Sequence, residues 1–137
     1  MRAFIDTSSL LKKYIREQGS DKFDQLLENI TEIVVSPTLL LEIHGAVQRR
    51  FHERIITLEQ AEFIKQEIKM DDIYLVKVPW SDDLEQKALH IIGHHRIKTL
   101  DSIQLASAHF SKADMFVTSD QKLFQTAKKK IKDAVLI

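Results

Sequence analysis

The first limits on this 137-residue chain come from what it lacks. It contains no cysteine, which excludes disulfide bonds, thiolate nucleophiles and cysteine-ligated zinc. No apolar run approaches the roughly 20 residues that a membrane-spanning helix needs. The first residues enter an apolar stretch directly, without the pattern of a cleavable signal peptide. We therefore expect a soluble, cytoplasmic protein with no membrane partner.

Turn-forming residues and net charge are also scarce. Only three glycines and two prolines interrupt the chain, and no linker or repeat divides it, so we expect residues 1–137 to form a single domain. With 20 basic and 20 acidic residues the net charge is zero, so composition alone does not indicate a nucleic-acid-binding protein. Basic residues do cluster locally, and each cluster is either a solvated helix face or a set of phosphate contacts: Lys12-Lys13, Arg49-Arg50, Arg54, Arg96–Lys98 and Lys128–Lys132.

What is present is an alternation of short β-type runs with longer helical patterns, which is typical of parallel βα units. The expected strands cover residues 2–6, 33–35, 73–78, 115–118 and 135–137. The expected helices run from Ser8 or Ser9 to about Arg16, over 21–29, from Ser36-Pro37 to about His52, from Thr57, from Ser81, from Asp101 to Phe110, and from Gln121 to about Lys130. Because such a sheet needs helices on both faces, we predict an α/β fold, a three-layer α/β/α sandwich around a mainly parallel sheet of about five strands.

Four acidic residues stand at or near the places where strands give way to helices: Asp6, Glu42, Asp101 and Asp120. In an open α/β sheet the carboxyl ends of the strands form the binding crevice. Carboxylates gathered there repel one another unless a cation lies among them. Hydroxyl side chains that can orient such ligands stand beside them, in Thr7-Ser8-Ser9 and in Thr118-Ser119. The pattern predicts a metal-dependent site that cleaves phosphodiesters.

Each acid also has an ordinary structural explanation. Asp6, Asp101 and Asp120 could cap helices, an interaction that typically contributes about 1 kcal/mol. Glu42 could be an exposed helical glutamate. Taken singly these explanations are the more economical, but four such positions at one edge of one sheet favour a functional site.

The motifs around these acids resemble the PIN domain over the whole length of the chain, and among its members they are most similar to the VapC toxins of prokaryotic toxin–antitoxin pairs. The resemblance rests on Ile5–Leu10, Leu41-Glu42, Leu100–Ala108 and Val117–Leu123. It implies an endoribonuclease that cuts single-stranded or loop RNA with Mg²⁺ or Mn²⁺, through a metal-activated water, and leaves 5′-phosphate and 3′-hydroxyl ends.

By position, the resemblance assigns the metal-binding and catalytic roles to Asp6, Glu42, Asp101 and Asp120, with Thr118 as a polar neighbour. It also implies a homodimer that is inhibited by a cognate VapB-like antitoxin. The identity of the metal, the antitoxin and the homodimer come from the resemblance alone, and spacing shows none of them.

Other functions stay open at this point. A non-catalytic PIN-fold module that binds RNA or a protein is compatible with the same motifs. A phosphoacceptor signalling domain would need an adjacent acidic pair after the first strand and a lysine after a late strand, and the chain has neither. A nuclease for structured DNA would need insertions for which 137 residues leave no room.

Overall fold

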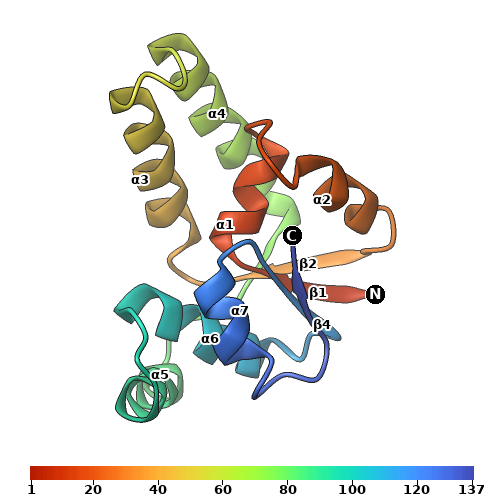
Figure 1. Cartoon of the computed structure of the whole chain (residues 1–137), viewed down its shortest axis with the longest axis vertical. Coiled ribbons are helices and arrows are strands. Elements are labelled where there is room, and N and C mark those ends of the chain that lie inside the picture. Colours follow the sequence, from red (N-terminus) through yellow and green to blue (C-terminus); the bar gives the residue numbers. More distant parts are fainter.

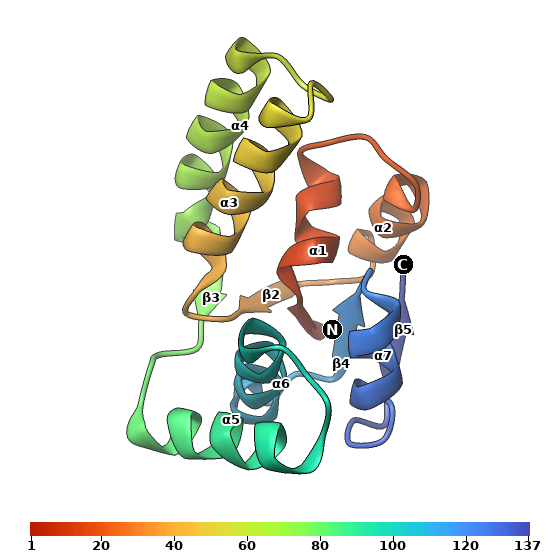
Figure 2. The ribbon, with the colours of Figure 1, turned by 60° about the vertical axis from the view of Figure 1, so that its left-hand side comes forward.

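A computed structural model, which describes residues 1–137, contains a sheet of five parallel strands in the order β3-β2-β1-β4-β5 (Figure 1 and Figure 2). The strands are β1 (Arg2–Ile5), β2 (Glu32–Val35), β3 (Val76–Lys77), β4 (Met115–Thr118) and β5 (Ala134–Leu136). The helices are α1 (Thr7–Leu10), α2 (Ser20–Leu27), α3 (Leu39–His52), α4 (Leu58–Asp71), α5 (Asp82–His94), α6 (Thr99–Ser111) and α7 (Gln121–Ala127), and short 3-10 helices cover Leu11–Lys13 and Asp72–Tyr74. The predicted α/β fold with a five-stranded parallel sheet is confirmed.

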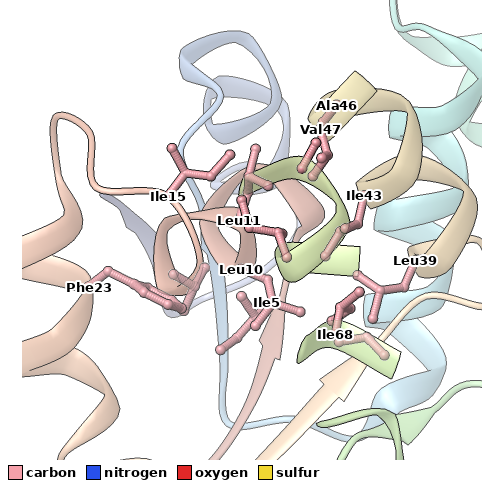
Figure 3. Close-up of a cluster of buried hydrophobic side chains, with 14 of the residues drawn as sticks. Ile5, Leu10, Leu11, Ile15, Phe23, Leu39, Ile43, Ala46, Val47 and Ile68 are labelled. Carbon is pink, nitrogen blue, oxygen red and sulfur yellow. The ribbon is translucent and has the colours of Figure 1, made fainter. Parts of the chain in front are cut away.

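The sheet separates two hydrophobic clusters, because successive side chains of a strand point to opposite faces. On β1, Ala3 and Ile5 join the cluster beneath α1 to α4, whereas Phe4 joins the cluster beneath α5 to α7. Figure 3 shows the first cluster, in which Ile5 lies among side chains from α1, α3 and α4. In the second cluster Phe4 stacks on Phe116, with ring centroids 5.7 Å apart. Helices therefore cover both faces, as the three-layer prediction requires.

Two predicted helix starts are confirmed by their caps. Thr57 Oγ1 accepts a hydrogen bond from the backbone N–H of Gln60, and Gln60 Oε1 accepts one from the backbone N–H of Thr57, which completes a capping box. Ser81 accepts from the backbone N–H of Leu84 at the start of α5. Both helices follow from local sequence, because the capping residue lies three positions before its donor.

Three other predicted helix starts were wrong. The first helix is capped by Asp6, not by Ser8 or Ser9. The helix predicted from Ser36-Pro37 begins only at Leu39, because the Ser36 hydroxyl bonds the side chains of Thr38 and Gln104 rather than the helix backbone. The helix predicted from Asp101 begins two residues earlier, at Thr99.

The third strand is shorter than residues 73–78 predicted. Only Val76 and Lys77 pair with β2, while Asp72–Tyr74 continues α4 as a 3-10 helix. Ile73 and Tyr74 are 79% and 77% exposed, so their apolar character does not mark a buried strand. The first predicted helix also ends early, because α1 ends at Leu10 and the 3-10 helix that continues it ends at Lys13, and α7 ends at Ala127. None of the helices combines the length and the apolar character that crossing a membrane would require.

Candidate active site

A cavity of about 750 Å³ opens at the carboxyl edge of the sheet, between the turns that follow β1 and β4 and the first turns of α3 and α6. Because all five strands are parallel, their carboxyl ends meet at this edge. Figure 2 shows α1, α3, α6 and α7 grouped around it. All four acidic residues singled out from the sequence line this one cavity: Asp6, Glu42, Asp101 and Asp120.

Asp6 is 5% exposed and immediately follows β1. Its Oδ2 accepts hydrogen bonds of 2.6 Å from the hydroxyls of both Ser8 and Thr118. Its Oδ1 has only a 3.4 Å contact with the backbone N–H of Ser8. One carboxylate oxygen is thus held firmly, and the other keeps most of its capacity for a further partner.

Hydrogen bonds join the turn after β1 to the turn after β4. The hydroxyls of Ser9 and Ser119 lie 2.8 Å apart, and the backbone N–H of Ser119 donates to the Ser8 hydroxyl at 3.1 Å. The backbone N–H of Asp120 donates to Thr118 Oγ1 at 3.0 Å, and that hydroxyl in turn donates to Asp6. The positions of Asp6 and Asp120 are therefore coupled through side chains that are close only in the folded protein.

Glu42 lies on the first turn of α3 and is held by three donors on one oxygen. Its Oε2 accepts from Thr7 Oγ1 at 2.8 Å, from Thr38 Oγ1 at 3.2 Å and from Gln104 Nε2 at 2.6 Å. The alternative of an exposed helical glutamate is therefore wrong. Glu42 Oε1 has no hydrogen-bond partner within the protein and remains available at the cavity.

Gln104 is a residue that reasoning from sequence missed. It is 1% exposed, and its amide also reaches Thr7 Oγ1 at 3.1 Å and Ser36 Oγ at 3.3 Å. Its position three residues after Asp101 puts both on the same side of α6, which was the available signal. A buried polar side chain of this kind orients the carboxylate that it contacts.

Asp101 and Asp120 reach the cavity in different ways. Asp101 is the third residue of α6, and no hydrogen bond stabilises its carboxylate. Asp120 caps α7, since its Oδ1 accepts from the backbone N–H of Leu123 at 2.8 Å. The capping explanation was therefore right for Asp120 and Asp6 and wrong for Asp101. Capping uses part of a carboxylate and does not remove it from the cavity.

The acids raise one another's pKa values. Burial, with added repulsion from Asp120 and Asp6, raises the pKa of Asp101 to about 6. Burial also raises the pKa of Asp6, against the lowering effect of its hydroxyl donors. The pKa of Glu42 is raised by burial and by the nearby charge of Asp6. None of the four acids forms a salt bridge with a lysine or arginine. The cavity therefore holds negative charge that the protein does not neutralise by ion pairing.

The rim of the cavity is basic. Lys12, Arg49, Arg50 and Lys98 all line it. Lys12 and Arg50 are paired with Glu17, at 3.2 Å and 3.0 Å. Arg49, for which the sequence left open a solvated helix face or a phosphate contact, is exposed and forms no salt bridge. Positive side chains around an acidic centre are suited to a phosphate-rich ligand.

The donor chemistry of the cavity fits a hard divalent cation. All four side chains offer carboxylate oxygens, which suit Mg²⁺ and Mn²⁺ better than soft metals. No three acidic or histidine side chains lie close enough together to enclose an ion by themselves. Mg²⁺ usually takes only one or two carboxylates directly and keeps several waters, so an open set of this kind suits it.

Comparisons with known proteins give a consistent result. The chain superposes with a TM-score of 0.70 on a chain of a toxin–antitoxin complex from Klebsiella pneumoniae, at 16% identity, covering 97% of this chain and 95% of that one. For Mycobacterium tuberculosis VapC20, a toxin that cleaves the sarcin–ricin loop, the TM-score is 0.70 at 15% identity, with 88% and 92% covered. For Rickettsia felis VapBC2 bound to a promoter DNA fragment it is 0.65 at 15% identity, with 100% and 98% covered.

A comparison with curated protein sequences finds no match. The model of one protein family does match the sequence, over residues 3–129, and its span includes the strand ends and all four acids of the cavity. Together with the parallel five-stranded sheet, this match identifies the chain as a member of the PIN domain family.

Proposed function

We propose that the protein is a metal-dependent endoribonuclease of the VapC toxin type, which hydrolyses phosphodiester bonds in single-stranded or loop RNA. The observation that carries the proposal is the convergence of Asp6, Glu42, Asp101 and Asp120 on one cavity, with no salt bridge to any of the four carboxylates. Purely structural acids are paired with cations or exposed to water, because uncompensated buried charge is costly.

The four acids divide into two kinds of role in this proposal. Asp6 and Asp101 would hold a divalent ion directly, because each has an oxygen with little or no competing hydrogen bond. Glu42 and Asp120 would act through water molecules or complete the ligand set. Thr7, Thr118 and Gln104 hold the carboxylates in position, and the basic rim binds the phosphates on either side of the cut.

Mg²⁺ or Mn²⁺, when bound, supplies a Lewis acid that lowers the pKa of water and stabilises negative charge on the leaving oxygen. Cleavage would then leave 5′-phosphate and 3′-hydroxyl ends. The chain's own contribution is to hold the carboxylates in fixed positions, while Arg49 and Lys98 orient the RNA backbone from the rim.

The biological setting is part of the same proposal. The structures most informative for comparison include a toxin–antitoxin complex, a sarcin–ricin-loop-cleaving toxin and a toxin–antitoxin pair bound to promoter DNA. A VapC-type role for this chain would place it in the cytoplasm, as a homodimer, under the control of a cognate VapB-like antitoxin.

The test is cleavage of single-stranded RNA with Mg²⁺, with Mn²⁺ and with chelator, beside two Asp→Asn variants. Asp101→Asn should abolish cleavage. It should leave the fold intact, because the Asp101 side chain makes no hydrogen bond. Asp133→Asn is the matched control, because Asp133 is exposed at the opposite edge of the sheet, just before β5. It should cleave at the wild-type rate.

Several outcomes would overturn the proposal. Cleavage that persists in chelator or in Asp101→Asn excludes the metal-dependent mechanism, and so does a 2′,3′-cyclic phosphate product. RNA binding without cleavage under every metal condition would instead identify a non-catalytic PIN-fold module.

A further inference from the structure

A second charged region lies outside the cavity, where the end of α5 approaches the segment after α7. We call it the α5–α7 basic patch. It consists of Lys87, His90, His94, His95, Lys129 and Lys130. In Figure 2 the end of α5 lies beside the end of α7, and α4 lies at the opposite end of the molecule. The proposed mechanism does not use this patch.

Two of its histidines form a pair on one face of α5. The ring centroids of His90 and His94 are 4.1 Å apart, which the spacing of four residues along a helix allows. His94 Nδ1 lies 2.8 Å from the carbonyl oxygen of His90 and donates to it. Both rings are exposed, so their remaining nitrogens are accessible to a partner.

The electrostatic surroundings of this pair are positive. The pKa of His90 is lowered first by His94 and then by partial desolvation, Lys87 and Lys130. The pKa of His95 is lowered by partial desolvation and by Lys130, Lys129 and His94. The pKa of His109, on the adjacent α6, is lowered first by burial and then by the same two lysines, Lys87 and Lys130. No carboxylate is among the causes of these shifts, and Lys87, Lys129 and Lys130 form no salt bridge.

The patch continues toward the acidic cavity along the segment between α5 and α6. That segment carries His95 at the end of α5, then Arg96, and then Lys98 on the cavity wall. On the α7 side, Lys122 lies close enough to lower the pKa of Asp101. Positive side chains therefore line a route from the catalytic acids to the α5–α7 basic patch.

The sign of the charge indicates what this surface binds. Two imidazoles four residues apart can in principle chelate a transition metal. Here, however, Lys87, Lys129 and Lys130 would repel a cation and attract an anion. A run of positive side chains that leads away from a phosphodiester-cleaving cavity matches the regular negative charges of a nucleic-acid backbone.

We propose that the α5–α7 basic patch is an RNA-binding surface outside the active site, which contacts backbone phosphates of the strand that enters the cavity along the α5–α6 segment. The proposal rests on the proposed function, because the partner is the substrate of that same cavity. If the patch binds RNA in this way, an RNA that extends farther on that side of the cleavage site should bind more tightly.

The first test uses Lys129→Ala/Lys130→Ala, with Lys65→Ala/Lys69→Ala on α4 as the matched control. Cleavage is compared for an RNA of about 4 nucleotides and one of about 20, since only the longer can reach beyond the cavity. Binding of the longer RNA is measured in chelator in the Asp101→Asn background, so that no cleavage occurs.

Loss of the two lysines should weaken binding of the longer RNA about tenfold at low salt and reduce the salt dependence of its affinity by about 1.4 log units per log unit of salt. Cleavage of the short RNA should be unchanged, and the α4 control should match the unsubstituted protein throughout.

If the patch variant and the α4 control behave equally in binding and in cleavage, the proposed role of the α5–α7 basic patch is overturned and the nuclease proposal stays intact. Absence of cleavage by the unsubstituted protein overturns the nuclease proposal, whereas the binding measurement still tests the patch. An equal loss of affinity for polyglutamate and for RNA would overturn the assignment to RNA and indicate an acidic protein partner.

The second test uses the histidines. Because the pKa values of His90 and His95 are lowered from 6.5, the patch gains positive charge as the pH falls below about 6.5, so RNA affinity and its salt dependence should both increase there. His90→Gln/His95→Gln should lose this increase, while His44→Gln/His52→Gln on α3 should keep it. Because Asp101 is already neutral in this background, its titration does not contribute. An identical increase in both double variants overturns the proposed role of the histidines.

Discussion

Two glutamates on the walls of the same cavity are treated by the protein in opposite ways. Glu17 is paired with Lys12 and Arg50, and their hydrogen bonds outweigh the effect of burial and lower its pKa. Glu42 receives only neutral donors, and burial together with Asp6 raises its pKa. Both side chains are partly buried and both are well hydrogen-bonded, so the difference lies in the charge of the partners.

That difference separates acids that complete the structure from acids that are reserved for a ligand. The charge of Glu17 is compensated by Lys12 and Arg50, so this carboxylate does not require a bound cation. Glu42 and Asp101 carry charge that is compensated only when a cation arrives. The repulsion between these carboxylates favours the binding of a cation. Without a cation, the same repulsion raises their pKa values.

The largest expected effect comes from the same substitution at these two glutamates. Glu42→Gln should reduce metal-dependent RNA cleavage by about 1,000-fold, because a neutral amide removes a charge from the proposed metal site. Glu17→Gln should stay within about threefold of wild type. Initial rates at saturating Mg²⁺ measure both. If both variants lost the same share of cleavage activity, the charge of a glutamate's partners would not distinguish functional from structural acids in this cavity.

A smaller effect is expected at Gln104, which positions Glu42. Gln104→Met preserves volume and helix propensity but removes the 2.6 Å hydrogen bond to Glu42. Loss of a residue that orients a metal ligand typically costs 10–100-fold in metal affinity or activity, and about 10-fold is expected here. The readout is the Mg²⁺ concentration for half-maximal cleavage, which a purely structural role would leave unchanged. An unaltered value would remove Gln104 from the site.

The smallest effect is the pH dependence of stability in chelator. The pKa of Asp101 in the folded protein is about 6, above its usual 3.8. The ionised carboxylate therefore destabilises the folded state above pH 6, and this destabilisation is lost as the pH falls from 6 toward 4. Asp101→Asn should therefore be more stable than wild type by about 1 kcal/mol at pH 8, since water screens this half-buried group. The difference should vanish by pH 4.

Glu17→Gln should show the opposite sign in the same denaturant titrations. The lowered pKa of Glu17 means that its carboxylate stabilises the fold above its usual pKa of 4.5 and loses that contribution only in more acidic solution. Its deficit should therefore stay constant between about pH 6 and 8. A pH-independent stability difference for Asp101→Asn would contradict the assigned titration.

Much of the fold follows from local patterns. The apolar runs of β1, β2 and β4 are buried central strands, and the caps at Thr57 and Ser81 can be identified from neighbouring residues alone. The exposed apolar residues Ile73 and Tyr74 misled the prediction of β3, because hydrophobic character shows what a residue would gain from burial and not whether a partner surface is available.

The acidic residues of the site could be predicted from the sequence, but the residues that hold them by hydrogen bonds could not. Asp6 and Asp120 stand out in sequence because strand ends and caps are local features. The environment of Glu42 depends on Thr7 and Gln104, which come from 35 residues before it and 62 residues after it. No spacing rule joins residues so far apart, so this network becomes evident only in the folded chain.

The hydrogen bonds between the turns after β1 and β4 have a consequence for protein synthesis. β1 needs β4 as its neighbour, and the hydroxyl that holds Asp6 belongs to Thr118. A nascent chain that has not yet released residues 115–120 from the ribosome therefore cannot assemble the acidic cavity. If the protein does cut RNA, translation of its own messenger is protected from the growing chain until residues 115–120 have emerged and paired with β1.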